Sequence, residues 1–287
     1  MEDGNVTGKV SESKSGEQAE PRTGNRGNQS RSGERVEGAG LHRRILSTKE
    51  GRDLGGKRHE EATDILKGNA GADVHAQQKI LIDWAKGKGY LYDKDDYKEL
   101  QKSWKKDENG ELVRIGGIES DVFPDFVNKQ VTKVVKDTRQ FNFDAKPIDY
   151  LNDRITYHNK YFPQTAYKLL GIMDYNVKFP DSQFSFVIDQ PFVIGETPTE
   201  EEIDKKLREI GFQTDAHSYF IKEEDGTYMR LGDTHQGNFI KDKDGNIISI
   251  DSVFEVVDAD DIGRVLSRKE VLDRRKRRKS KIKNNNV

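Results

Sequence analysis

Hydrophobic residues are sparse in the N-terminal quarter of the chain and become periodic only after it. Residues 1–72 are rich in Gly, Ser, Asn, Glu and Arg and show no helical or strand period, so this extension is expected to be disordered. From Val74 onward the pattern changes, and Ile80, Leu81 and Trp84 recur at helical spacing. An ordered domain is therefore expected to begin near this point.

The central part of the chain combines predicted strands with predicted helices. A helix is expected after the N-cap residue Thr199, with acidic residues in its first turn and Gly211 at its end. Its apolar stripe consists of Ile203, Leu207 and Ile210. Strands are predicted at residues 130–135, within residues 184–196, where a strand runs into a linker, and at residues 219–221 and 228–230, joined by an Asp-Gly turn. This mixture indicates an α+β fold.

A second Asp-Gly pair predicts a hairpin between residues 238–242 and 246–251. If Asp244 and Gly245 form a two-residue turn, counting outward places Asn238 directly opposite Asp251. Side chains at directly opposite positions lie roughly 5 Å apart on one face. Two oxygen-bearing side chains would then be close enough to bind one Mg²⁺ ion, which takes few protein oxygens and completes its shell with water and phosphate. An ordinary surface hairpin with polar ends is the alternative.

The spacing of these residues from a preceding aspartate indicates a chemistry. Asp233 lies five residues before Asn238, and Asp251 follows thirteen residues after Asn238. ATP-dependent phosphoryl transfer uses such a set, in which one carboxylate orients the attacking hydroxyl while an amide and a second carboxylate hold the metal.

Composition excludes some classes of protein and adds a charge asymmetry. Hydrophobic residues make up 32% of the chain and charged residues 35%, which is too polar for the whole length to be packed. The chain has no cysteine, no signal-peptide pattern and no apolar run near the roughly 20 residues that span a bilayer, so we expect a cytoplasmic protein without a membrane partner. Residues 268–283 carry a net charge of about +8, whereas the whole chain carries −2.

The segment at residues 232–238 resembles the catalytic loop of the aminoglycoside-phosphotransferase and related kinase-like enzymes, usually written G-D-L-H-P-G-N. Residues 250–251 resemble their metal-binding step. The resemblance implies that Asp233 is the catalytic base, that Asn238 and Asp251 bind Mg²⁺, and that His235 stabilises the loop. A longer pattern over residues 74–260 resembles the kinase-like domains found in polyvalent proteins of phages and conjugative elements.

Two further segments resemble parts of a kinase small lobe. Residues 115–122 can be aligned with the glycine-rich pattern, which implies that Gly116 and Gly117 approach the phosphates and that Val122 covers the adenine. Only one of the three pattern glycines is matched, and a plain Gly-Gly turn is the alternative. In the strand at residues 130–135, Val131, Lys133 and Val135 share one face. This resembles the kinase strand in which a lysine pairs with phosphates, with Val131 beneath the adenine; Lys136 is the alternative lysine.

The resemblance also implies a carboxylate on the next helix and a linker that binds adenine. The segment at residues 148–155 contains no glutamate, so Asp153 is expected to pair with the lysine, beside a buried stripe of Leu151, Ile155 and His158. In the linker, backbone groups near Gln190 and Phe192 are expected to bond the adenine edge, with Phe192 as the N–H donor because Pro191 has none.

These observations predict a minimal bilobal protein-kinase-like α+β fold over residues 73–263, preceded by the extension at residues 1–72 and followed by a basic tail at residues 264–287. The predicted function is ATP- and Mg²⁺-dependent phosphoryl transfer to a protein Ser, Thr or Tyr hydroxyl. The alternatives are a small-molecule phosphotransferase, a nucleotide-binding pseudokinase, and a nucleic-acid-binding accessory protein of a mobile element. The tail is either simply solvated or contacts nucleic acid without sequence specificity.

Overall fold

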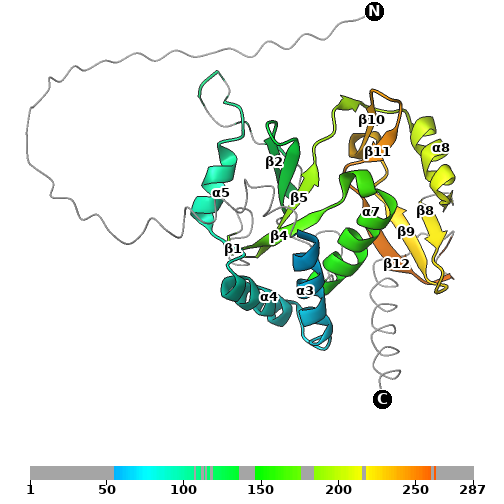
Figure 1. Ribbon diagram of the computed structural model, residues 1–287. Coiled ribbons are helices and arrows are strands. Elements are labelled where there is room, and N and C mark those ends of the chain that lie inside the picture. The colour runs from blue at the N-terminus through cyan, green and yellow to red at the C-terminus, as the bar shows by residue number, and fades with distance from the viewer. Residues whose placement is uncertain are drawn as a thin grey trace, which may run out of the picture. The chain divides into compact units, whose positions relative to one another are not determined.

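The computed structural model describes residues 55–106, 108–110, 113, 115–116, 119–135, 146–175, 184–214, 218–259 and 262 (Figure 1). The predictions for residues 1–54, for Gly117, for Lys136 and for the basic tail at residues 264–287 lie outside these described residues.

The sequence-based prediction that residues 1–72 are disordered is wrong for residues 55–67. Helix α3 (Gly55–Lys67) forms in the last part of this extension and packs on strand β4 (Lys168–Met173). Ala62 and Leu66 are fully buried, and the Arg58 guanidinium lies over the Tyr90 ring and donates to the Leu170 carbonyl. The helix was missed because its buried face depends on small and long polar side chains, which give little apolar periodicity.

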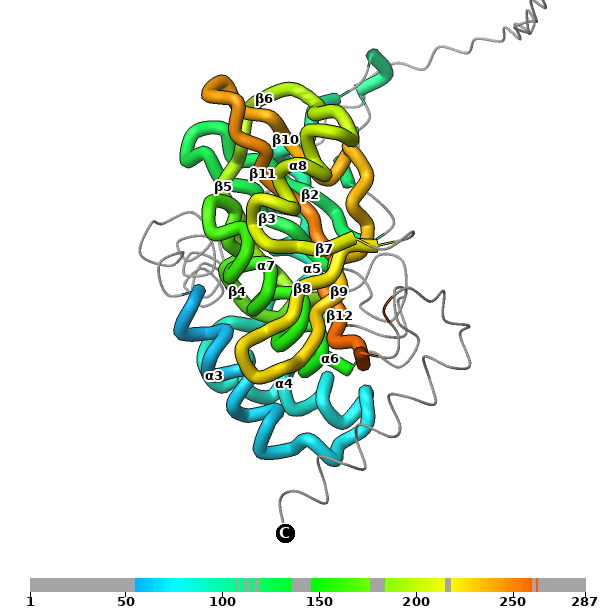
Figure 2. The backbone as a smooth tube through the Cα atoms, turned by 90° about the vertical axis from the view of Figure 1, so that its right-hand side faces the viewer, coloured from blue at the N-terminus to red at the C-terminus, as the bar shows by residue number. Residues whose placement is uncertain are grey.

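Helix α4 (Val74–Lys88) begins where order was expected. The Asp73 side chain caps it by accepting from the Ala76 N–H, and Gly89 ends it in the left-handed conformation at φ 74°. Leu81 and Trp84 face the core, as their spacing predicted. Helices α3 and α4 pack against each other (Figure 2).

The first lobe is a five-stranded sheet with the strand order β1-β4-β5-β3-β2. Its remaining strands are β1 (Leu91–Tyr92), β2 (Ser120–Asp125), β3 (Gln130–Val135) and β5 (Ser185–Pro191). One face packs on α3, α4 and the helical segment described below, while the other packs on aromatic residues of helix α5 (Lys94–Gln101) and the segment after it. Both faces are therefore buried. Val135 and Val134 belong to opposite cores, which confirms the predicted alternation of β3.

A helical segment crosses behind this sheet in three parts: α6 (Pro147–Asp149), the π-helical turn η1 (Tyr150–Ile155) and α7 (Thr156–Tyr161). Leu151, Ile155 and His158 are fully buried, so the predicted stripe is confirmed. A short 3₁₀ turn, η2 (Pro163–Thr165), then leads into β4. The π-helical turn shifts the register of the segment, an irregularity that is frequent at functional sites.

The second lobe contains two small sheets and one helix around a separate core. A four-stranded sheet has the order β12-β9-β8-β7, and a three-stranded sheet has the order β11-β10-β6. Their strands are β6 (Gly195–Glu196), β7 (Gln213–Thr214), β8 (Tyr219–Lys222), β9 (Tyr228–Gly232), β10 (Phe239–Asp242), β11 (Ile247–Ser249) and β12 (Val253–Val257). Helix α8 (Glu200–Ile210) has the predicted N-cap at Thr199, which forms a capping box with Glu202, and the predicted Gly211 terminus. The α+β fold class is confirmed.

The buried His158 gives a prediction about stability. Its ring stacks on Tyr167 at 4.0 Å between centroids, and its Nε2 lies 3.0 Å from the Thr165 carbonyl. Burial, assisted by the charge of Lys133, lowers the pKa of His158 from 6.5 to about 3. The unfolded chain therefore takes up a proton near pH 6.5 that the folded chain does not, so acidification destabilises the fold. Between about pH 7.5 and pH 5.5 this residue should remove about 1.4 kcal/mol from the free energy of unfolding.

Urea unfolding of the wild type and of His158→Phe at both pH values checks this prediction. The variant should lose less stability on acidification than the wild type, by about that amount. The exposed His75, changed to Gln, is the matched control and should leave the pH dependence unchanged. Equal pH dependence of the wild type and His158→Phe would contradict a buried neutral histidine.

Candidate phosphoryl-transfer site

The loop after β9 is built around two of the predicted site residues. The Asn238 side-chain amide donates to the Asp233 carbonyl at 2.8 Å and to its carboxylate Oδ2 at 2.9 Å. Between them, the His235 Nδ1 accepts from the Gly237 N–H at 3.1 Å and caps the 3₁₀ turn η3 (Gln236–Asn238). The loop thus fixes the Asp233 carboxylate relative to Asn238, and His235 stabilises its backbone.

Asp233 has an unusual backbone conformation. Its φ is 57°, in the left-handed region, and Lys129 is the other non-glycine residue with positive φ in the described part of the chain. Aspartate and asparagine tolerate this region better than other side chains, but it still costs energy. Strain of this kind clusters at functional sites, where the surrounding structure holds it in place. The Asp233 side chain remains 45% exposed, so an acceptor molecule has access to it.

The hairpin differs from its predicted register by one residue. Phe239 pairs with Ser249 and Lys241 with Ile247, which places Ile250, and not Asp251, opposite Asn238. The turn contains three residues and ends at Gly245 with φ 81°, whereas the prediction assumed a two-residue turn. Asp251 is still held beside Asn238, because its N–H lies 3.4 Å from the Asn238 carbonyl after the strand has ended.

The Asp251 carboxylate lies between two buried cations. Its Oδ1 accepts from an Arg154 guanidinium nitrogen at 2.6 Å, and its Oδ2 lies 3.9 Å from the Lys133 Nζ. Burial alone would raise the pKa of Asp251, but Lys133 and Arg154 outweigh it and hold the pKa well below its ordinary value. The carboxylate is therefore ionised at neutral pH, as a metal ligand requires.

Lys133 projects from β3 into this site, as the strand pattern predicted. Its Nζ donates to the Ile250 carbonyl at 2.8 Å and lies 5.2 Å from the centroid of the Tyr167 ring. The Gln190 side chain donates to the same carbonyl at 3.0 Å. Burial lowers the pKa of Lys133, and the nearby Asp251 charge opposes this effect. The lysine thus connects the first lobe to the residue just before Asp251.

The prediction that Asp153 pairs with this lysine is wrong. The carboxylate nearest to Lys133 is that of Asp251, and the helical segment presents Arg154 to the site instead. Arg154 is 6% exposed and also forms an ion pair with Glu119. It lies three residues after Leu151 and four before His158, which is a position on the same buried stripe. A charged residue on a buried stripe could have been recognised from the sequence as one that needs acidic partners.

Gly116 lies beside the start of β2. Gly116 has φ 133° and bridges Asp121, and a side chain on it would collide with the Ser120 carbonyl. Val122 pairs with Lys133 across the β2–β3 ladder, and the half-buried Val122 and the buried Val131 lie on these two strands. Glu119, the residue before β2, forms an ion pair with Arg154. The start of β2 therefore lies close to the candidate site, although the glycine pattern in the sequence matched only one of three glycines.

In the linker, the backbone groups that were expected to bind adenine are already hydrogen-bonded within the sheet. The Phe192 N–H, expected to face adenine, donates to the Lys129 carbonyl at 2.9 Å. Gln190 pairs with Val131 two positions earlier in the same ladder. Because the hydrogen-bonding residues of an antiparallel ladder alternate, the backbone groups of Gln190 also face β3. The expectation failed because β3 and β5 continue to pair one residue beyond Pro191.

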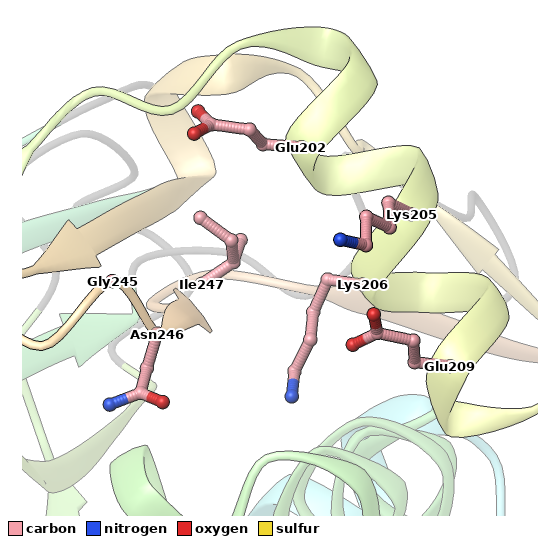
Figure 3. A pocket seen from close by; sticks show the side chains of 7 residues that line it. All are labelled: Glu202, Lys205, Lys206, Glu209, Gly245, Asn246 and Ile247. Carbon is pink, nitrogen blue, oxygen red and sulfur yellow. The ribbon is translucent and has the colours of Figure 1, made fainter.

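A cavity of about 280 Å³ lies elsewhere in the second lobe, between α8 and the tip of the β10–β11 hairpin (Figure 3). It is lined by Glu202, Lys205, Lys206, Glu209, Gly245, Asn246 and Ile247. The candidate site residues are at the opposite end of this hairpin, since Asn238 precedes β10 and Asp251 follows β11. This cavity is therefore not the site defined above.

The donor atoms at the site suit Mg²⁺. With its amide nitrogen bonded to Asp233, Asn238 has its side-chain oxygen left as an acceptor. Asp251 has Oδ2 left, because Arg154 occupies Oδ1. Among the described residues, no group of three or more His, Cys, Asp or Glu side chains could hold a metal. Two protein oxygens agree with the way Mg²⁺ binds, since it keeps several waters and takes phosphate oxygens.

Two lobes joined by a linker, with Lys133 from one lobe beside Asp251 from the other, define a kinase-like protein. Residues 74–258 match the family model described as serine/threonine/tyrosine kinase found in polyvalent proteins, and the chain belongs to this family. Comparison with the curated proteins and with the solved structures gave no match. None of the helices in the described ranges is long and apolar enough to cross a membrane.

Proposed function

We propose that this protein transfers the γ-phosphoryl group of ATP to a hydroxyl acceptor with the help of Mg²⁺. The observation that carries the proposal is the convergence of Asp233, Asn238 and Asp251 in one loop region with Lys133 beside Asp251. Phosphoryl transfer depends on positioning and on stabilising charge, and each of these side chains supplies one of the two.

The roles follow from the geometry. Asp233, held by Asn238, accepts a hydrogen bond from the acceptor hydroxyl and orients its oxygen toward the γ-phosphorus. Lys133 binds phosphate oxygens. Asn238 Oδ1 and Asp251 Oδ2 would hold Mg²⁺, which would neutralise phosphate charge. Gly116, together with Gly117, lets the backbone approach the phosphates.

The backbone groups proposed to bind adenine differ from those predicted from the sequence. Since the backbone groups of Gln190 and Phe192 face β3, their neighbours in the linker face the other way. The Pro191 carbonyl and the Val193 N–H are therefore the groups proposed to bond the adenine edge, with Val122 and Val131 packing on its ring.

The family description supports a protein Ser, Thr or Tyr hydroxyl as the acceptor. The rival acceptor is a small-molecule hydroxyl, because the loop spelling resembles the aminoglycoside-phosphotransferase class. A mobile-element host, a cytoplasmic location and non-specific contact of the basic tail with nucleic acid belong to the same proposal. A pseudokinase that binds nucleotide without transfer is an outcome of the test below.

Calorimetric titration of ATP with and without Mg²⁺ tests nucleotide binding. The wild type should bind Mg·ATP, and Lys133→Met should weaken this binding by about 10- to 100-fold, because a charge-assisted phosphate contact is lost. Lys79→Met is the matched control, since it removes one exposed positive charge from the same lobe and should have no effect. Absence of ATP binding by the wild type would reject the proposed function, and binding without phosphate transfer would assign a pseudokinase.

A further inference from the structure

Four charged side chains form one buried network at the junction of the two lobes. Arg154 pairs with Glu119 through one terminal guanidinium nitrogen and with Asp251 through the other. Lys133 lies on the other oxygen of Asp251. The network joins the residue before β2, the helical segment, β3 and the segment after β11.

Burial makes this arrangement costly unless every charge is paired. The side chains of Arg154 and Glu119 are 8% and 12% exposed. Arginine stays protonated, so it cannot avoid the cost by losing its proton. Breaking such a pair leaves an uncompensated buried charge, and buried pairs are weak evidence for stability in themselves. An apolar residue at position 154 would avoid the cost of burying a charge. Stability therefore does not account for an arginine here, and the orientation that it gives to its partners is the other property that it could supply.

The two oxygens of the Asp251 carboxylate have different neighbours. Arg154 binds Oδ1, and the Tyr167 hydroxyl lies 3.4 Å from the same oxygen. Oδ2 lies 3.9 Å from the Lys133 Nζ, and the Asp251 side chain is 28% exposed. Side chains that hold a ligating carboxylate in this way orient it, and losing such a partner typically costs 10- to 100-fold in metal affinity.

We propose that Arg154 is a positioning residue, which orients the Asp251 carboxylate for Mg²⁺ in place of the helix carboxylate that the kinase pattern leads one to expect. This inference rests on the proposed function. Glu119 holds the second arm of the guanidinium and keeps it in the orientation that Asp251 needs. In this chain the lysine pairs directly with the metal-binding aspartate, and the helical segment supplies a cation.

The test is the Mg²⁺ concentration that gives half-maximal ATP binding, measured by titrating Mg²⁺ at fixed ATP. Arg154→Met should raise this concentration by about 10-fold or more, while ATP binding at saturating Mg²⁺ changes little. Glu119→Gln keeps a hydrogen-bond acceptor for Arg154 and should shift the concentration far less. The double variant Arg154→Met/Glu119→Gln removes both buried charges, so it restores stability lost in Arg154→Met but not the Mg²⁺ response.

Each result decides the question. An unchanged Mg²⁺ response in Arg154→Met, with wild-type Mg·ATP binding intact, overturns the inference and leaves the proposed function standing. A lower half-maximal concentration also overturns it, because Arg154 would then compete with the metal for Asp251. Recovery of the Mg²⁺ response in the double variant would show that Arg154 acts only through stability. No Mg·ATP binding by the wild type rejects the proposed function itself.

Discussion

Asp233→Asn is expected to reduce kcat for phosphate transfer by about 10²- to 10⁴-fold while the protein stays folded and binds Mg·ATP. The asparagine keeps the size of the side chain and an oxygen for the Asn238 amide, which donates to Asp233 at 2.9 Å. It also tolerates the left-handed backbone at φ 57°. It removes the negative charge that, in the proposed function, orients an acceptor hydroxyl. Alanine at this position would add backbone strain, so a loss of activity could not be assigned to the lost charge alone.

Steady-state kinetics with an accepting substrate, together with the ATP dissociation constant, measure this effect. Asp244→Asn is the matched control, because Asp244 is an exposed aspartate at the tip of the β10–β11 hairpin that follows the Asp233 loop. It should leave kcat unchanged. A kcat for Asp233→Asn within a few fold of the wild type would remove Asp233 from the mechanism.

Asp251→Asn is expected to affect both stability and activity. Asp251 is the counter-ion of Arg154 at 2.6 Å and of Lys133 at 3.9 Å, and both cations are buried. Losing the shared negative charge should lower the free energy of unfolding by about 2–4 kcal/mol, somewhat less than breaking a fully buried pair because the Asp251 side chain is 28% exposed. The same change removes the charge of the proposed metal ligand, so Mg²⁺-stimulated ATP binding and phosphate transfer should both disappear.

Urea unfolding and Mg²⁺-dependent ATP binding separate these two consequences. Addition of enough osmolyte to restore the stability of Asp251→Asn should not restore Mg²⁺-stimulated binding. If binding returned with stability, Asp251 would be a structural residue and not a metal ligand. Asp83→Asn, at an exposed aspartate in the first lobe, is the control and should change neither quantity.

The local signals in the sequence predicted local structure well. The helix Glu200–Ile210 has the predicted cap at Thr199 and the predicted end at Gly211, and β3 has the predicted bounds and alternation. Capping and alternation depend on neighbours within a few residues, and these are visible in the sequence. The loop with Asp233 and Asn238 was located from the short spacing between these residues and from its resemblance to a known catalytic loop.

Features that depend on distant partners were missed. Arg154 finds its partners in Glu119 and Asp251, which lie 35 and 97 residues away in the sequence. The Phe192 N–H is taken by Lys129 because the β3–β5 ladder extends beyond Pro191. The predicted register of the hairpin is wrong by one residue, because Asp-Gly also fits a three-residue turn with Gly245 in the left-handed conformation. None of these outcomes follows from local propensity.

The most direct test of phosphoryl transfer is incubation of the purified protein with ATP labelled at the γ-phosphate, with Mg²⁺ and a panel of protein and small-molecule hydroxyl acceptors. Label should pass from ATP to at least one acceptor with the wild type, and not with Asp233→Asn or Asp251→Asn. Transfer that is equally fast in both variants, or a wild type that binds no ATP, would contradict the account.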